Sequence, residues 1–483
     1  MERLSFTLED SQYAYPCREM LQQFAPELQV VFNDDTADYR IEVDVCENRL
    51  GLAFYAGDRR ELAREYTLDK DMPLDKECLK GFLYLFLCEH FKRQLDWGTL
   101  TGIKPVKMAH ALMHQGKSAQ EAAAELKDAF MISDKKLDLI TEIAGREMPL
   151  IYPLDKGRVS VYIGVPICIA KCSYCSFIST VADKKGVLAE TYLQNLCREL
   201  RATGEFLKAQ GLSVDTLYIG GGTPSVFDAG QLSRLLDCTE AALDLSKLRE
   251  YTFESGRPET TTPEKLRLMK AHGVGRICFN PQSMNPKTLE AVGRLYTPED
   301  IRRGMAEIRE VGFDAVNMDL ILGLNHESQE DFLNSLEAVM AMVPENITVH
   351  CLSVKKGSAI KMATGHQVEA LYPGSFYDEV QDRLRAAGYH PYYLYRQKYT
   401  QGNGENIGYS LPGKEGVYNI LMMSEKQTII GIGAGSSGKL YLPDEDRFER
   451  VFTVKDVRTY NTRYSEILEK KMNNYRLWLS QLG

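Results

Sequence analysis

The feature that most constrains the fold is a regular alternation of strand-like and helix-like segments beginning at Val159. Alternation of this kind predicts a parallel sheet with right-handed crossovers. Six units predict a partial (β/α)6 barrel, because eight are needed to close the full barrel, and functional residues are expected at the carboxyl ends of its strands. The strands are expected at 159–165, 216–221, 250–255, 276–281, 315–320 and 346–351, and the helices at about 187–210, 228–243, 263–272, 298–311 and 328–342. Thr262 and Pro263 are expected to begin the third helix as N-cap and first residue.

The regions on either side of this alternation have other patterns. Residues 1–150 predict a separate α+β domain, to which no chemistry is assigned. Its expected elements are strands at 39–44 and 49–55 and helices at 76–94, about 105–115, 119–131 and 135–146, the third opened by a Ser118–Glu121 capping box. The barrel is expected over 151–355. Residues 356–483, which are irregular and end in a helix near 459–480, predict a C-terminal α+β domain that covers the barrel mouth.

Charge and hydrophobicity exclude several classes of partner. The net charge of −9 argues against binding to nucleic acid, since no surplus of positive charge attracts phosphate chains. No apolar run is long enough to span a membrane, and the acidic first residues lack the apolar centre of a signal peptide. These observations predict a cytoplasmic protein, in which the 11 cysteines are not expected to form disulfides.

The most specific motif is Cys168-Ile-Ala-Lys-Cys172-Ser-Tyr-Cys175. Three thiolates at offsets of four and three residues can surround one compact inorganic group, and soft sulfur ligands suit an iron–sulfur cluster or zinc. A closed structural zinc site needs a fourth ligand, and no Cys or His follows soon after Cys175. Three ligands would leave one iron of a [4Fe–4S] cube open for chemistry. Three unrelated buried cysteines are the alternative.

A second motif, Gly220-Gly221-Gly222-Thr223-Pro224, follows the second expected strand directly. Glycines allow the backbone to approach a ligand closely, and its free N–H and C=O groups suit an amino-acid moiety. By itself this motif also fits a plain tight turn.

The cysteine motif, with an aromatic residue before its last cysteine, resembles the signature of radical S-adenosylmethionine (SAM) enzymes. This resemblance implies a radical SAM barrel in which Cys168, Cys172 and Cys175 hold a [4Fe–4S] cluster. It implies that the amino and carboxylate groups of SAM chelate the fourth iron. An electron from the cluster would then split SAM into methionine and a 5′-deoxyadenosyl radical.

Within this superfamily the chain resembles the oxygen-independent coproporphyrinogen III dehydrogenases (oxidases), and among them the HemZ-type branch, over residues of about 155–355. The resemblance implies two sets of SAM contacts. The set for the cluster-bound SAM is Tyr162, Gly221 and Glu254. The set for a second SAM position is Tyr174, Gly222, Thr223, Gln282, Arg294 and Asp319. Carboxylates can pair with an ammonium group, and Arg can hold a carboxylate with two hydrogen bonds.

The resemblance also implies a reaction and partners. The reaction is oxidative decarboxylation of two propionate side chains of coproporphyrinogen III, which gives the vinyl groups of protoporphyrinogen IX in heme biosynthesis. The expected partners are an anionic tetrapyrrole substrate and a reductant protein such as flavodoxin or ferredoxin. Candidate cations for the substrate carboxylates are Lys355, Lys356, Arg396 and Lys398.

Two departures from the family pattern leave alternatives open. Phe177 stands where the decarboxylating members carry a further Cys, and the related heme-chaperone branch shows the same loss. The chaperones, however, usually carry a His-Asn pair where this chain has Glu405-Asn406. A heme-binding chaperone or carrier therefore stays an alternative, as does another anaerobic radical enzyme acting on tetrapyrroles, such as one that opens the heme ring.

Overall fold

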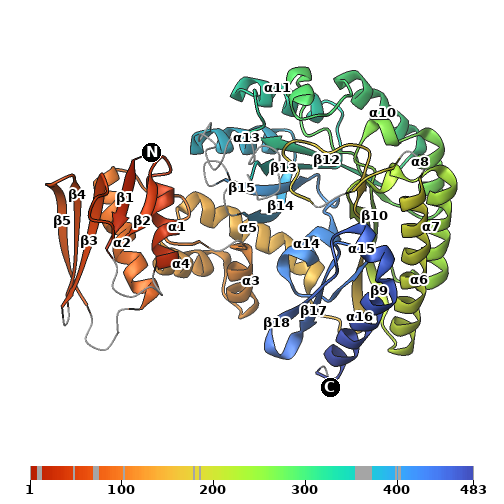
Figure 1. Cartoon of the computed structure of the whole chain (residues 1–483), viewed down its shortest axis with the longest axis horizontal. Coiled ribbons are helices and arrows are strands. Elements are labelled where there is room, and N and C mark those ends of the chain that lie inside the picture. The colour runs from red at the N-terminus through yellow and green to blue at the C-terminus, as the bar shows by residue number, and fades with distance from the viewer. Residues whose placement is uncertain are drawn as a thin grey trace. The chain divides into compact units, whose positions relative to one another are not determined.

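The computed structural model describes residues 2–7, 14–46, 49–68, 75–101, 104–177, 180–183, 186–353, 372–397, 400 and 404–481. The chain divides into two compact units, residues 1–142 and 143–483. Figure 1 labels the elements of both units.

The first unit contains a five-stranded sheet of order β2-β1-β3-β4-β5, packed against two helices. Its strands are β1 (Arg3–Phe6), β2 (Gln29–Phe32), β3 (Tyr39–Cys46), β4 (Arg49–Ala56) and β5 (Arg59–Thr67), and the two helices are α1 (Ala14–Phe24) and α2 (Lys76–Phe91). The core includes Leu4, Phe6, Leu21, Leu83 and Phe86. The two predicted strands are confirmed as β3 and β4, which pair with each other antiparallel.

The remaining helices of this region also follow the predicted pattern. They are α3 (Val106–His114), α4 (Ala119–Phe130) and α5 (Asp134–Ile151), the last of which runs into the second unit. The capping box of Ser118 and Glu121 is present at the start of α4. Helix α5 is longer than predicted and continues past Pro149.

The second unit is built on an eleven-stranded sheet of order β14-β15-β13-β12-β11-β10-β9-β6-β16-β17-β18. The six predicted strands lie side by side in chain order, and each neighbouring pair is parallel. They are β6 (Arg158–Val165), β9 (Ser213–Gly221), β10 (Glu250–Glu254), β11 (Arg276–Cys278), β12 (Ala315–Leu322) and β13 (Asn346–Cys351). The mixed α/β class and the parallel order are thus confirmed, and closure into a partial barrel stays a prediction.

The crossover helices connect the parallel strands. They are α6 (Val187–Ala209), α7 (Ala229–Ala242), α8 (Pro263–Ala271), α9 (Pro286–Ala291), α10 (Pro298–Val311) and α11 (Gln329–Met340). Figure 1 shows α6, α7, α8, α10 and α11 together on one face of this sheet. Thr262 caps α8 as predicted, with its hydroxyl accepting from the Lys265 N–H. The fourth strand is shorter than predicted: the regular strand ends at Cys278, and beyond it the chain returns to β12 through an isolated bridge between Gln282, which has a left-handed φ of 69°, and Leu320.

The C-terminal region adds strands to both edges of the same sheet. Strands β14 (His390–Arg396) and β15 (Glu405–Ser410) extend it beyond β13, and β16 (Ile429–Ile432) pairs in parallel with β6. Strands β17 (Ser437–Leu442) and β18 (Arg447–Phe452) follow β16. The helices of this region are α13 (Gly374–Ala386), α14 (Val417–Ser424), α15 (Val457–Thr462) and α16 (Tyr464–Leu479).

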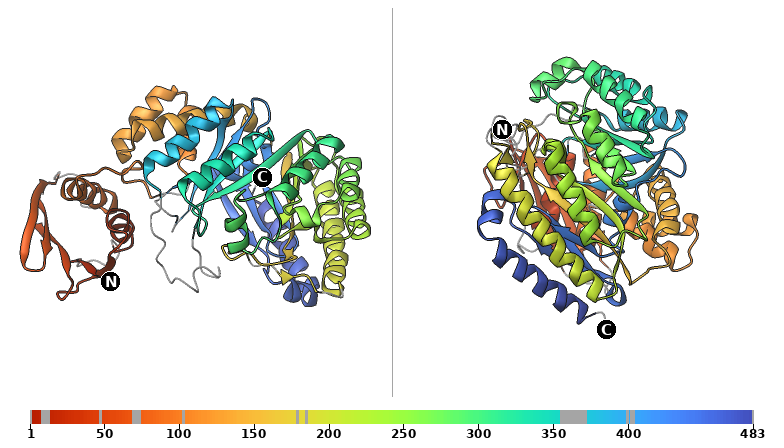
Figure 2. Two further views of the ribbon diagram at one scale, coloured as in Figure 1. Left: turned by 90° about the horizontal axis from the view of Figure 1, so that it is seen from above. Right: turned by 90° about the vertical axis from the view of Figure 1, so that its right-hand side faces the viewer.

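The predicted single helix at 459–480 is two helices, α15 and α16. Helix α16 is attached to α6 by a buried ion pair between Lys471 and Glu199, and the Tyr460 hydroxyl of α15 donates to the same carboxylate. Figure 2 (right) shows α16, in dark blue, beside α6. No helix in the described part of the chain combines the length and hydrophobicity that crossing a membrane requires.

The close packing of α6 on α7 predicts a strong effect of one methyl group. A Cβ at Gly204 of α6 would lie 1.9 Å from the Ala242 carbonyl oxygen of α7. We expect Gly204→Ala to lower the free energy of unfolding by at least about 2 kcal/mol in chemical denaturation. Gly145 of α5 is a matched control, because its Cβ would meet no described atom within 4 Å. Gly145→Ala should raise stability by about 0.5–1 kcal/mol, and equal effects of the two substitutions would show that the α6–α7 contact is not tight.

Candidate cluster and cofactor site

The three cysteines lie in one loop that follows β6. Cys168 ends the two-residue strand β7 (Ile167–Cys168). This strand pairs with β8 (Thr180–Val181), so the segments before and after the loop lie side by side. Cys168 and Cys172 are buried, Cys175 is half-buried, and all three are free thiols. Burial raises the pKa of the Cys175 thiol, and the nearby sulfurs of Cys172 and Cys168 raise it further, so the three groups lie within electrostatic range.

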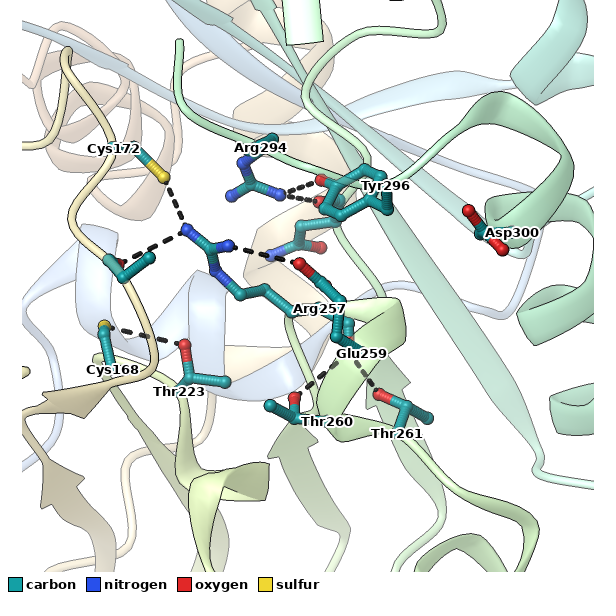
Figure 3. A network of polar contacts seen from close by, with 12 residues as sticks. Cys168, Cys172, Thr223, Arg257, Glu259, Thr260, Thr261, Arg294, Tyr296 and Asp300 are labelled. Atoms are coloured by element: carbon teal, nitrogen blue, oxygen red, sulfur yellow. Dashed lines mark hydrogen bonds and ion pairs between the residues drawn. The ribbon is translucent and has the colours of Figure 1, made fainter. Parts of the chain in front are cut away.

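Two of the cysteine sulfurs accept hydrogen bonds from neighbouring loops, as Figure 3 shows. The Thr223 hydroxyl donates to the Cys168 sulfur over 3.6 Å. The Arg257 guanidinium donates to the Cys172 sulfur over 2.9 Å. Such donors stabilise thiolates, which are the form that binds metal.

Within the described residues, no three His, Cys, Asp or Glu side chains converge as the ligands of a single metal ion would. This fact does not bear on a [4Fe–4S] cube, because each of its cysteines binds a different iron. Three neighbouring thiols, two of them with hydrogen-bond donors, are a donor set that fits such a cluster.

The glycine motif packs against the start of the cysteine loop. Gly221 has a left-handed φ of 124°, and a Cβ there would lie 2.8 Å from the Val165 backbone. A Cβ at Gly222 would lie 2.8 Å from the Cys168 sulfur. The close approach predicted for a ligand is therefore made, at these positions, to the protein's own strand and cysteine.

Glu254, at the end of β10, is bonded to the glycine motif. Its carboxylate accepts from the Tyr218 hydroxyl over 2.7 Å and from the Gly221 N–H over 3.0 Å. Burial raises the pKa of this carboxyl to about 7, although the two hydrogen bonds lower it. The ring of Tyr162 stacks at 5.9 Å from that of Tyr218, which stacks at 4.6 Å from that of Tyr418. Tyr162, Gly221 and Glu254 thus lie close together, and their contact with one ligand stays a prediction.

Of the residues predicted for the second SAM position, Gly222 and Thr223 lie against Cys168, and the other four fall into two groups. In the first group, Arg294 donates to the Tyr174 hydroxyl over 3.2 Å and to the Asn280 carbonyl oxygen over 2.8 Å. Tyr296, which the sequence does not single out, also contacts Arg294. Arg294 is only 7% exposed, so its charge is largely shielded from water.

The second group contains Gln282 and Asp319, whose backbones are joined by a 2.8 Å hydrogen bond from the Gln282 N–H. The Gln282 side-chain oxygen is buried and has no hydrogen-bond partner. Asp319 accepts from Asn317 over 2.7 Å and lies 3.6 Å from His350. Burial would raise the pKa of Asp319, but His350 and Asn317 lower it to below its ordinary value. An unsatisfied buried oxygen beside an ionised carboxylate fits a polar ligand.

Sequence reasoning missed Arg257, Tyr218, Tyr418 and His350. Only Arg257 had a signal, since it stands in the segment TFESGRPET, three residues after Glu254. Of the candidate substrate cations, Arg396 is 6% exposed at the end of β14. The other three, Lys355, Lys356 and Lys398, lie outside the described residues.

The raised pKa of Glu254 predicts a pH-dependent gain in stability when its charge is removed. A folded-state pKa of about 7, against an ordinary value of 4.5, means that the folded protein binds this proton more tightly than the unfolded chain. The stability that this carboxyl contributes is therefore present below pH 4.5 and is lost as the pH rises through 7. Glu254→Gln should raise the free energy of unfolding, and this increase should be larger at pH 8 than at pH 4 by up to about 3 kcal/mol.

Thermal and chemical denaturation at both pH values would measure this difference. The exposed Glu290, replaced by Gln, is the control and should show no such dependence. An equal effect of Glu254→Gln at both pH values would show that burial does not hold back the ionisation of this carboxyl.

The chain is similar to several known proteins over the region that contains this site. The family model "Radical SAM superfamily" matches residues 162–339, which include the cysteine loop, β10 and Asp319. The oxygen-independent coproporphyrinogen-III oxidase-like protein HemZ of Bacillus subtilis is 38% identical over 399 residues, covering 81% of this chain and 79% of HemZ. The heme chaperone HemW of Escherichia coli is 30% identical over 288 residues, covering 59% of this chain and 71% of HemW.

Among solved structures, the coproporphyrinogen III oxidase HemN of Escherichia coli superposes with a TM-score of 0.51. The match covers 68% of this chain and 73% of HemN at 19% identity, so it shows a shared fold. Together, the cysteine loop, the fold and the extent of the similarity to HemZ establish that the chain belongs to the HemZ-like oxygen-independent coproporphyrinogen III oxidase family of the radical SAM superfamily.

Proposed function

We propose that the chain catalyses the oxygen-independent oxidative decarboxylation of coproporphyrinogen III to protoporphyrinogen IX. Membership of the radical SAM superfamily implies a [4Fe–4S] cluster and SAM. The observation that carries the proposal is the position of the cysteine loop, because Thr223 after β9, Arg257 after β10 and Arg294 after β11 all donate hydrogen bonds to it. When bound, the cluster and SAM supply the one-electron chemistry that removes a hydrogen atom from a propionate side chain.

The residues of the chain have separate roles in this proposal. Cys168, Cys172 and Cys175 hold the cluster. Tyr162, Gly221 and Glu254 contact the SAM bound to it, and the ionised form of Glu254 is suited to the ammonium group of its methionine moiety.

A second SAM position is lined by Tyr174, Gly222, Thr223, Gln282, Arg294 and Asp319. The unpartnered oxygen of Gln282 supports this placement, since a ligand donor would satisfy it. The buried charge of Arg294 is suited to a carboxylate, of which SAM has one and the substrate has four.

The proposal extends to the surroundings of the site. Residues 356–483 are proposed to cover the substrate, which would keep water from the reacting radical. A cytoplasmic reductant protein such as flavodoxin or ferredoxin is the proposed source of electrons.

An anaerobic activity assay tests the proposed reaction. Protein reconstituted with iron and sulfide, given coproporphyrinogen III, SAM and a reductant, should form protoporphyrinogen IX. Cys172→Ala should lose the cluster absorbance near 400 nm and reduce product to background, whereas Cys46→Ala, which replaces an exposed cysteine of β3, should change neither. Cleavage of SAM without a vinyl product would refute the substrate but not the radical chemistry.

One observation favours a second candidate, a heme-binding carrier. Phe177 is 73% exposed at the position where decarboxylating members carry a further Cys, and HemW of Escherichia coli is named a heme chaperone. We expect a carrier to bind one heme per chain and to show no turnover of SAM stimulated by substrate. Heme titration beside the activity assay separates the two functions, and loss of heme absorbance during turnover would indicate opening of the heme ring instead.

A further inference from the structure

A buried arginine joins the cysteine loop to the strand that carries Glu254. Arg257 follows the end of β10 by three residues, and its side chain crosses to a loop 85 residues earlier in the sequence. One guanidinium nitrogen donates to the Cys172 sulfur over 2.9 Å and lies 3.4 Å from the Ala170 carbonyl oxygen. The residue is 4% exposed, so this contact is made away from water (Figure 3).

The backbone that carries Arg257 is held in place by hydroxyl groups. The Arg257 carbonyl oxygen accepts from the Thr260 hydroxyl over 3.1 Å and from the Thr261 hydroxyl over 2.8 Å. Thr260 and Thr261 in turn contact Ser225 at 2.6 Å and Ser255 at 2.7 Å. The backbone from which the guanidinium extends to the Cys172 sulfur is therefore fixed by hydrogen bonds, which limits how far the side chain can move away.

The charge of Arg257 is only partly balanced. Its single ion-pair partner among the described residues is Glu259, at 3.5 Å, and the Glu259 side chain is 31% exposed. A buried cation acts strongly over short distances, because little water lies between it and the sulfur. Arg294 also lies within electrostatic range of Cys172, but it donates its hydrogen bonds to Tyr174, Tyr296 and Asn280.

We propose that Arg257 is a positioning residue that sets the reduction potential of the cluster held by Cys172. The inference rests on the cluster of the proposed function. Reduction adds a negative charge to the cluster, and an N–H donor with a full positive charge beside one ligand sulfur stabilises that added charge. Arg257 therefore makes the cluster easier to reduce. The neutral hydroxyl of Thr223 does the same for Cys168 to a lesser extent.

Redox titration of the reconstituted full-length protein, followed by electron paramagnetic resonance, tests this role. In Arg257→Gln the ratio of reduced to oxidised cluster at a fixed potential should fall about tenfold, which corresponds to a midpoint about 59 mV more negative. Arg257→Lys, which keeps the charge, should shift the midpoint less. The control Arg267→Gln, on the exposed face of α8, should leave the midpoint unchanged.

A second variant keeps the test decisive where Arg257→Gln does not fold. Glu259→Gln leaves Arg257 in place and removes its balancing carboxylate, so the midpoint should move to a less negative value. Iron-loaded variants with the midpoint of the unmodified protein would overturn the role of Arg257 while leaving the proposed function intact. Absence of iron from the unmodified, air-free protein would overturn both.

Discussion

The geometry of the site depends on the contact between the glycine motif and the turn that leads into the cysteine loop. The Gly222 and Thr223 N–H groups donate to the Val165 and Ile167 carbonyl oxygens, each over 2.9 Å. Since a Cβ at Gly221 or Gly222 would overlap these atoms, only glycine lets β9 and the loop after β6 come so close. This contact fixes Cys168 beside Thr223 and turns the Gly221 N–H toward Glu254.

The surroundings of the site shift the pKa values of its buried carboxyls in opposite directions and bring two arginines close to the cysteines. Burial raises the pKa of Glu254 to about 7, so part of this carboxyl is protonated near neutral pH. Asp319 keeps its charge, because His350 and Asn317 lower its pKa despite burial. Arg257 and Arg294 place two buried cations near Cys172. Although the chain has a net charge of −9, it thus places two buried cations beside cysteines that would bind metal as thiolates.

The sequence predicts the central strands and their helices well because each has a strong period and clear capping signals. It misses β1 and β2, which have four residues each, and β5, whose run RRELAREYT is charged and exposed at the edge of a sheet. The motif residues are recognisable through their resemblance to a family. The contacts of Arg257 and Tyr418 are not, because they join elements that are distant in sequence and follow no local spacing, although Arg257 itself stands close to Glu254 in the chain.

The pairing of β6 with β16 has a consequence for how the chain matures. Ser160 lies opposite Ile429, so the strand that leads into the cysteine loop gains one of its two neighbours only from a segment synthesised after the other parallel strands β9 to β13. Until then an edge of β6 stays open beside the three thiols of the loop, a situation that favours non-native strand pairing and exposes the thiols to oxidation. The sheet beside this loop is therefore paired on both sides of β6 only once β16 has folded back against it, and an inorganic cluster is best inserted after that step.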